Sequence, residues 1–426
     1  MVVPPLIVEP AAIVTSWPLD PGRGSGTARF VRSLLHAWER IGANPVLLNP
    51  TSDIEDYVAF TLRRVADNLD LASHPVLREA NAVVALDYDG FAYVPAPAQR
   101  FVVTTRAVFA DLIETEPEPY RSMLRLQAML EERNVARADC VVTPSAYARG
   151  RVIELYGIPP ERVRVIHNGI DLAEWDALGA SLGGGLGDAH GDALEDALGD
   201  PPGKGPSDTA GNAHRHDHGR AHGDAQRGDR EPGDRRGESQ APTVLAVSKL
   251  YPRKMIETLV RATPLLRRRL PEVQVRIVGA GFQWDELRAL ARQIGAEDGI
   301  AWLGDVTERA AIVREYRRCH VFTHPSIQDA FANVCLEAMA SARPLVVSDA
   351  GSMPELVRAS GAGVIVPPRE PEALAEALLA LLVNDARREQ LGQAGRRFAE
   401  TMTWERTAAG FLEALGCGSN RVARPT

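Results

Sequence analysis

Short apolar runs alternate with amphipathic helical segments along most of this chain. Runs at 6–15, 83–86 and 140–143 are each followed by a helical pattern, the last of which Ser145 is expected to cap. The same alternation restarts with a run at 244–247. Strands that alternate with helices favour parallel sheets with right-handed crossovers. Because the chain has 426 residues, it is long enough for two such domains.

A polar segment at 178–241 separates the two alternating blocks. It consists mainly of Gly, Asp, His, Arg and Pro, and almost no large apolar residue follows Leu198. Such a composition cannot bury a core, so we expect a disordered insertion at the hinge between a first domain at 1–177 and a second at 242–402. Five of the ten histidines lie in this segment, and its HRHDHGRAH portion could alternatively bind a transition metal loosely.

The totals exclude several classes of protein. A net charge of −8 argues against general nucleic-acid binding, which needs a basic face. The four cysteines show neither metal-ligand spacing nor a disulfide framework, so a reducing cytoplasm is expected. The first residues contain prolines and no basic region, which disfavours a signal peptide. The sequence has no run of 18 apolar residues, so no membrane-spanning helix is expected. Peripheral contact with a membrane stays open.

The stretch from 319 to 342, CHVFTHPSIQDAFANVCLEAMASA, carries the clearest chemical signal. A short strand at 321–323 leads through a polar loop into a helix, with Asn333 as the expected N-cap. Such a helix start directs N–H groups and the positive dipole end at one spot, which favours a phosphate. Asp329 and Glu337 flank that spot and could hold hydroxyls of a sugar and a ribose attached to the phosphate. Alternatively, both acids are solvated.

Further candidates lie between other strands and helices. Lys249 and Lys254, five residues apart after the run at 244–247, form a natural clamp for a diphosphate, unless both are simply solvated. Gly279 ends another predicted strand, where a nucleotide could lie against bare backbone. Gly24 and Gly26, in the loop WPLDPGRGSGT, could likewise let a ligand approach the backbone or form a flexible turn.

A dinucleotide-binding fingerprint is a poor match for this glycine-rich loop. The spacing differs from G-x-G-x-x-G, and the second strand ends at Asn49 instead of an acidic residue for the ribose. A nicotinamide-dependent oxidoreductase is therefore the weakest of the enzymatic alternatives.

An acidic residue, seven further residues and then Glu before Ala-Met-Ala resembles the signature of family 4 glycosyltransferases. The resemblance implies the GT-B fold, an α/β architecture of two Rossmann-like domains that face an interdomain cleft, with a final helix at about 403–417 packing back on the first domain. It also implies that Asp329, where Glu is usual, contacts the donor sugar, that Glu337 binds the ribose, and that amides at Asn333 and Val334 meet the diphosphate.

Other family positions match with changes. The basic pair is Lys249 and Lys254, although its first member is commonly Arg, and Met255 stands where Gly is common. The glycine-rich loop with Gly24 and Gly26 would face the cleft, as would Gly279, all on the donor side. Arg106 occupies a position at which many members have a cleft-facing His. It could bind an anionic group of the acceptor, or it could cap a surface loop.

The function that this resemblance implies is transfer of a sugar from a nucleotide-diphosphate sugar to an acceptor hydroxyl, with retention and without a metal or other cofactor. The acceptor could be a glycan, a lipid-linked molecule or a small molecule. Lys249, Lys254 and the helix start would stabilise the leaving diphosphate, and Asp329 would position the sugar. The alternatives are a sugar-nucleotide epimerase, a phosphorylase, and a nucleotide-binding regulator without transferase activity.

Overall fold

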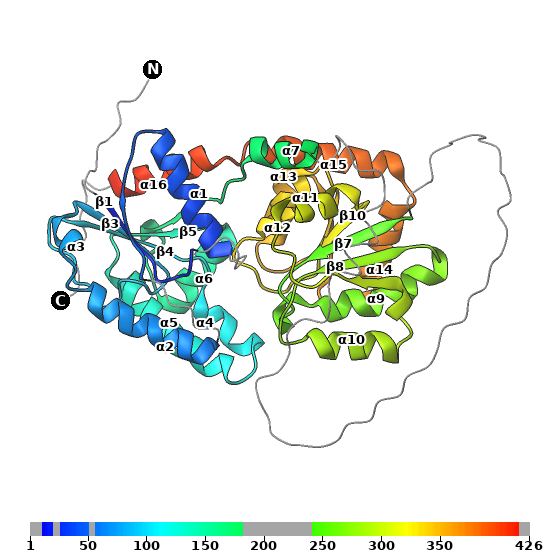
Figure 1. Ribbon diagram of the computed structural model, residues 1–426, viewed down its shortest axis with the longest axis horizontal. Coiled ribbons are helices and arrows are strands. Elements are labelled where there is room, and N and C mark those ends of the chain that lie inside the picture. Colours follow the sequence, from blue (N-terminus) through cyan, green and yellow to red (C-terminus); the bar gives the residue numbers. More distant parts are fainter. Residues whose placement is uncertain (1–10, 20–25, 51–55, 182–240, 417–426) are drawn as a thin grey trace, which may run out of the picture.

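The computed structural model describes residues 11–19, 26–50, 56–181 and 241–416. Two α/β halves lie side by side, the first blue to cyan and the second green to orange (Figure 1). The expectations for Gly24 and for most of the segment at 178–241, including its histidines, fall outside the described residues. No helix in the described ranges combines the length and the apolar character that crossing a membrane requires.

The first half contains a six-stranded sheet in the order β2-β1-β3-β4-β5-β6, in which every neighbouring pair is parallel. Its strands are β1 (Ala11–Val14), β2 (Val46–Leu48), β3 (Ala82–Leu86), β4 (Arg100–Thr104), β5 (Cys140–Thr143) and β6 (Val163–Val165). Its helices are α1 (Gly26–Arg40), α2 (Tyr57–Leu71), α3 (Pro75–Glu79), α4 (Phe109–Leu112), α5 (Tyr120–Arg137) and α6 (Ala146–Tyr156).

The second half repeats this design with the order β12-β11-β10-β7-β8-β9, again with parallel neighbours. Its strands are β7 (Thr243–Val247), β8 (Gln274–Val278), β9 (Ile300–Trp302), β10 (Val321–His324), β11 (Leu345–Ser348) and β12 (Gly363–Val366). Its helices are α9 (Ile256–Arg269), α10 (Trp284–Gln293), α11 (Arg309–Arg318), α12 (Asn333–Ala340), α13 (Met353–Ser360), α14 (Pro371–Leu382) and α15 (Asp385–Ala399).

Each sheet is covered by helices on both faces, which explains why its strands are apolar without alternation. In β3, Val83 and Ala85 belong to the core on one face, and Ala82, Val84 and Leu86 belong to the core on the other. The strand β7 is divided in the same way between the two cores of the second half. Continuous apolar runs in the sequence are therefore the expected signal of these central strands.

Two helices cross between the halves. The helix α16 (Trp404–Gly416) returns from the end of the chain to lie beside α1 (Figure 1), where Phe411 contacts the rings of Phe30 and Trp38. The helix α7 (Leu172–Ser181) follows the first half in sequence but packs beside α11 of the second. Its Trp175 is fully buried and donates from Nε1 to Ser341 Oγ at 2.9 Å.

The position of α7 moves the domain boundary expected from the sequence. Residue 177 lies in the middle of this helix, and 178–181 form its last turn rather than the start of a disordered insertion. The apolar face around Trp175 needs the core of the second half to cover it. By packing, α7 therefore belongs to the second half.

Besides the two crossing helices, a stack of aromatic rings connects the halves. Tyr120, at the start of α5, stacks on Phe282 of the second half, with 4.9 Å between ring centroids. Tyr57 and Tyr251 extend the stack at its two ends. Beside it, Arg253 forms an ion pair with Glu116, whose side chain is almost fully buried. These contacts hold one side of the space between the sheets closed.

Candidate active site

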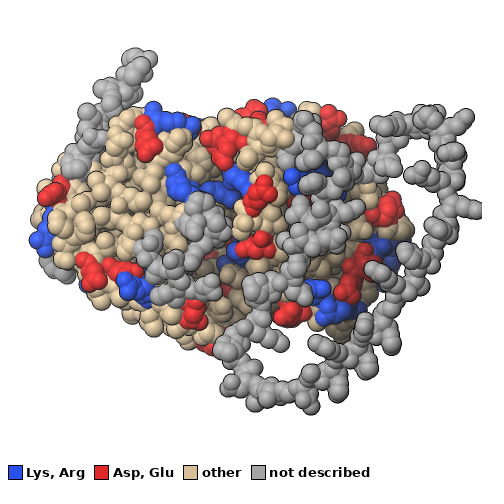
Figure 2. Space-filling model, viewed as in Figure 1, with Lys and Arg blue, Asp and Glu red and all other residues tan. Residues whose placement is uncertain are grey.

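A cavity of about 420 Å³ lies between the two halves. It is reached by the segments that follow β4, β7 and β10, so the carboxyl ends of strands from both sheets face it, as expected for ligand sites in open α/β sheets. Figure 2 shows Lys and Arg side chains gathered along the middle of one face, between the halves, with Asp and Glu beside them. Every predicted site residue in the described ranges lines this cavity: Gly26, Arg106, Lys249, Lys254, Gly279, Asp329, Asn333, Val334 and Glu337.

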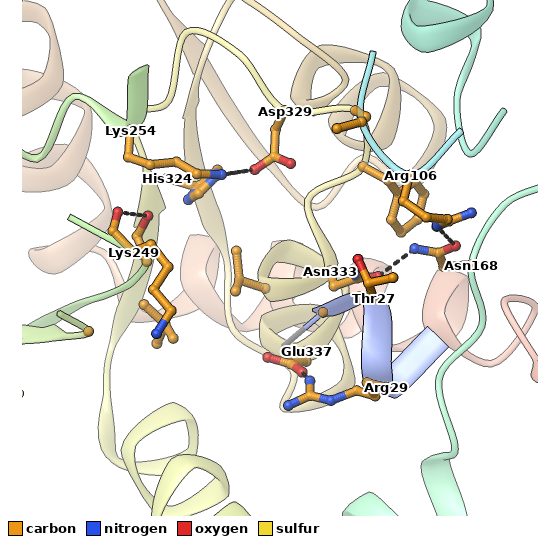
Figure 3. Close-up of a pocket in the computed structure, with 18 of the residues that line it drawn as sticks. Thr27, Arg29, Arg106, Asn168, Lys249, Lys254, His324, Asp329, Asn333 and Glu337 are labelled. Carbon is orange, nitrogen blue, oxygen red and sulfur yellow. Dashed lines mark hydrogen bonds and ion pairs between the residues drawn. The ribbon is translucent and has the colours of Figure 1, made fainter. Parts of the chain in front are cut away.

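The helix α12 begins at Asn333, so Asn333 is its first helical residue and not the N-cap residue that precedes it. Ala332 occupies the cap position, and no side chain caps the helix start. The prediction that Asn333 is the N-cap is therefore wrong. Its side chain instead crosses the cavity, where its Oδ1 accepts a hydrogen bond from Asn168 Nδ2 at 2.8 Å (Figure 3). In the first turn of α12 the N–H groups of Asn333 and Cys335 donate to Phe331 O and Ala332 O. The Val334 N–H has no such partner among the described residues and is left to serve an anion.

Asp329 lies at the centre of a buried charge cluster. Its Oδ2 is 2.5 Å from Lys254 Nζ and 3.0 Å from His324 Nε2. Burial favours the neutral carboxyl, but the charge of Lys254 and the hydrogen bond from His324 outweigh it and hold the pKa of Asp329 well below its usual range. Burial also lowers the pKa of His324, so the neutral ring donates its Nε2–H to the ionised carboxylate.

Glu337 lies one turn into α12 and faces the other half of the molecule. Its side chain is 8% exposed; Oε1 pairs with Arg29 of α1, and Oε2 accepts from the Tyr316 hydroxyl at 3.0 Å. Figure 3 shows Arg29 reaching Glu337 across the cavity. The carboxylate predicted to bind a ribose therefore lines the cavity and forms an ion pair with a residue of the first half.

Lys249 and Lys254 lie on the same wall but point to different acids. Lys249 is 43% exposed, and its Nζ lies 3.2 Å from Asp305 Oδ2, whereas Lys254 is directed at Asp329 (Figure 3). Two separate ammonium groups are therefore available to an anionic ligand.

Gly279 also lines this cavity. Packing requires a glycine at this position, because a Cβ there would lie 1.7 Å from Ser248 O.

Arg106 forms part of the opposite wall, contributed by the first half. Its guanidinium lies over the ring of Phe30, 3.7 Å from the centroid, and Nη2 donates to Asn168 Oδ1. Its backbone N–H donates to Asp87 Oδ1. Burial lowers the pKa of Arg106 to about 10, so the side chain stays cationic at neutral pH. Arg106 therefore faces the cavity and does not cap a surface loop.

Sequence reasoning missed His324, Arg29 and Asn168. His324 could have been found as the last residue of a buried strand that points to the same edge as Asp329. Arg29 and Asn168 carry no such signal, because their roles arise only when the halves meet. Within the described ranges, no group of three or more His, Cys, Asp or Glu side chains is arranged to hold a metal ion. The expectation of a metal-independent reaction stays a prediction.

Comparison with protein families assigns both halves. Residues 230–398 match the family model for glycosyl transferases group 1, and residues 24–174 match the model for glycosyltransferase family 4. The chain belongs to the family 4 glycosyltransferases. The two matched ranges include every strand of both sheets except β1, and all the residues that line the cavity.

Two curated relatives give the range of similarity within the family. This chain is 29% identical over 312 residues to a D-inositol 3-phosphate glycosyltransferase of Salinispora arenicola, covering 70% of this chain and 58% of the relative. It is 30% identical over 193 residues to a GDP-mannose-dependent α-(1-6)-phosphatidylinositol monomannoside mannosyltransferase of Mycobacterium tuberculosis, covering 41% and 48%. The matches thus span about half to three fifths of the relatives' own length.

Solved structures confirm the GT-B fold of this family 4 glycosyltransferase. Sucrose-phosphate synthase of Thermosynechococcus elongatus superposes with a TM-score of 0.67 at 18% identity, covering 94% of this chain and 97% of that protein. The HepE protein of Anabaena, crystallised with UDP-glucose, gives 0.63 at 16% identity, covering 95% and 99%. The two Rossmann-like domains facing a cleft are therefore as the sequence predicted.

Proposed function

We propose that this chain transfers a glycosyl group from a nucleotide-diphosphate sugar to an acceptor hydroxyl, with retention at the anomeric carbon and without a metal. One observation carries the proposal: two lysines, an uncapped helix start and two carboxylates converge in one cavity between the domains. The cations and the helix start suit a diphosphate, and the carboxylates suit the hydroxyls on its two sides.

The negative charge of the leaving diphosphate explains why cations line the cavity. As the bond between the anomeric carbon and the phosphate oxygen breaks, negative charge grows on the diphosphate. Lys249, Lys254 and the first turn of α12 stabilise that charge because their donors already line the cavity before the charge develops. Lys254 has three N–H donors, so it serves a phosphate oxygen while it keeps its contact with Asp329.

Asp329 positions the donor sugar in this proposal. Its contacts with Lys254 and His324 both go to Oδ2, so Oδ1 remains, among the described residues, to accept a hydrogen bond from a sugar hydroxyl. The ionised state of Asp329 suits an acceptor-only role. On the other side of the diphosphate, Glu337 accepts from the ribose hydroxyls.

Retention follows from displacement on a single face of the sugar. The acceptor oxygen forms its bond to the anomeric carbon on the side from which the diphosphate leaves, and the leaving phosphate oxygen takes the proton of the acceptor hydroxyl. Bond formation, bond cleavage and proton transfer thus balance without a protein nucleophile. We assign no general base to this chain.

The relatives suggest substrates for the first tests. One is named for inositol 3-phosphate, another for GDP-mannose and a phosphatidylinositol mannoside, and HepE was crystallised with UDP-glucose. UDP- and GDP-hexoses are therefore the first donors to test, with glycans, polyols and lipid-linked polyols as acceptors. A lipid-linked acceptor would bring the chain to a membrane surface.

A thermal-shift panel of UDP, GDP, ADP and their sugars tests the proposal, because a ligand that binds only the folded state raises its stability. We expect one nucleotide series to raise the unfolding midpoint, and the matching sugar nucleotide to be consumed with an acceptor. Failure of every nucleotide to stabilise the chain would contradict the proposal. Conversion of the donor without an acceptor would indicate an epimerase, and binding without any product would indicate a regulator.

A further inference from the structure

Arg106 differs from every other basic residue of the cavity wall in the described structure. It alone, among those residues, has no carboxylate partner. The other lining cations form the pairs Arg29–Glu337, Lys249–Asp305, Arg253–Glu116, Lys254–Asp329 and Arg309–Glu174.

The acids nearest to Arg106 are occupied by other groups. Asp87 accepts the backbone N–H of Arg106 on Oδ1 and the Trp17 indole N–H on Oδ2, so neither oxygen is bonded to the guanidinium. Asp111, which also lines the cavity, is held by Arg151 and by the Tyr147 hydroxyl, each at 2.6 Å. Asp87 attracts the Arg106 guanidinium through space but forms no ion pair with it. The guanidinium therefore keeps N–H donors for an anion in the cavity.

The guanidinium is also held in a fixed orientation. Its Cζ lies over the Phe30 ring, and Nη1 is 3.5 Å from Thr104 Oγ1. Its Nη2 is bonded to Asn168, which is 2% exposed and is itself bonded to Asn333. A guanidinium fixed in this way loses little freedom when it binds a further group, and its remaining N–H donors match the geometry of a carboxylate or phosphate. Burying such a charge without an anion is costly, and a bound oxyanion offsets that cost.

We propose that Arg106 is the anion-binding residue of the acceptor site, and that the acceptor carries a phosphate or carboxylate group that lies against it. This inference rests on the proposed glycosyl transfer. Figure 3 shows Arg106 across the cavity from Lys249 and Lys254, so the anion it binds is separate from the diphosphate of the donor. The wall belongs to the first domain, whereas the lysines and carboxylates proposed to hold the donor come from the second.

Calorimetric titration of inorganic phosphate tests the site directly. The protein is first saturated with the nucleoside diphosphate that stabilises it, so that the lysine site is filled. We expect phosphate to bind the wild type and to bind Arg106→Gln at least about tenfold more weakly, because charge-assisted hydrogen bonds are lost. Arg106→Lys keeps the charge without the fork and should fall between the two.

Arg358→Gln is the matched control. Arg358 is exposed, pairs with Asp349 on the second domain and does not line the cavity, so its loss should leave phosphate affinity unchanged. Nucleoside diphosphate binding reports separately on folding and on the proposed function. If no nucleotide binds, the proposed function fails. If nucleotide binds but the wild type binds no phosphate, or binds it as tightly as Arg106→Gln does, the anion site is wrong.

Paired substrates identify which molecule carries the anion. Glucose and glucose 6-phosphate, or glycerol and glycerol 3-phosphate, are compared as acceptors or as competitors, and UDP-glucose is compared with UDP-glucuronate as donor. We expect the wild type to prefer the phosphorylated acceptor by about tenfold or more and Arg106→Gln to lose that preference. A preference that depends on Arg106 only for the uronate donor would overturn the assignment to the acceptor.

Discussion

Lys254 reaches Asp329 from a single 3-10 turn, Pro252–Lys254, and both side chains are largely buried. We predict that Lys254→Ala lowers kcat by about a hundredfold to a thousandfold, because it removes a preorganised cation from the leaving group. Steady-state turnover of the matching sugar nucleotide measures this. Lys249→Ala provides the comparison and should have a smaller effect, because Lys249 is 43% exposed. Equal turnover in Lys254→Ala and the wild type would contradict the role.

Asp87 gives the stability a specific pH dependence. Burial raises its pKa from 3.8 to about 6, only partly countered by the hydrogen bond from the Arg106 backbone. Between these values the folded state holds a proton that the unfolded state has released, so stability falls as pH rises from about 4 to about 6. We predict that the wild type loses about 2 kcal/mol more than Asp87→Asn between pH 4 and pH 7.

Urea unfolding of both proteins at the two pH values measures this difference, since contributions from other groups largely cancel between them. A wild-type-minus-variant difference that is the same at pH 4 and pH 7 would show that Asp87 titrates normally in the folded protein.

Among single residues, those whose roles depend on local spacing could be predicted from the sequence. Lys254, Asp329 and Glu337 stand at fixed distances from a strand end or helix start, and all reach the cavity. Arg29 and Asn168 were missed because they act across the gap between the domains. For Arg106 the sequence left two roles open, binding of an anionic acceptor group and capping of a surface loop. Only its packing on Phe30 distinguishes them.

Gly279 determines how closely the end of β8 approaches the loop after β7. Its φ is +138°, and an added Cβ would lie 1.7 Å from Ser248 O. We predict that Gly279→Ala destabilises the protein by about 3 kcal/mol through strain and displacement of that loop. The measurement is the free energy of unfolding in urea, which falls because the folded state alone is strained.

Gly150→Ala is the matched control, because Gly150 lies within α6 and a Cβ there has open space. This substitution should be neutral or stabilise the protein by up to about 1 kcal/mol, as Ala suits a helix interior better than Gly. Similar destabilisation by both substitutions would mean that the close approach at Gly279 is not what matters.

The elements themselves could largely be predicted, because central strands are apolar throughout and helices show one apolar face. Ser145 caps α6 as expected, accepting from the Ala148 N–H at 3.0 Å. Asn333 does not cap α12, because its side chain is used across the cavity. Met255 stands where Gly is common in the family, and its φ of +51° shows the backbone reason for that preference.

The whole molecule is joined at several separate places. The aromatic stack and the Arg253–Glu116 pair close one side, while Arg29–Glu337 and Asn168–Asn333 cross the cavity itself. The sequence could not predict these joints, because each joins side chains from two different domains. The crossing helix α7 was missed for the same reason, as its apolar face matches a core that lies far along the chain.

We predict that Phe282→Ala combined with Arg253→Gln loosens the joint between the domains. The ring pair contributes about 1 kcal/mol, and Arg253→Gln leaves the Glu116 carboxylate buried without its partner, at a cost of about 3 kcal/mol. Both losses shift the population toward separated halves, in which Glu116 is solvated. Small-angle scattering of the unliganded protein should give a larger radius of gyration for this variant. Val383→Ala removes an exposed apolar side chain elsewhere in the second domain and should leave the curve unchanged, as no joint depends on it. Identical curves for all three proteins would show that these contacts do not hold the halves together.

Calorimetric titration of UDP, GDP and ADP shows whether the cavity holds a nucleoside diphosphate with Glu337 on its ribose. We predict that one of them binds the wild type at a single site, and that Glu337→Gln binds it at least about tenfold more weakly, because the ribose hydroxyls lose a charged acceptor. No binding to the wild type, or equal affinity in the two proteins, would contradict it.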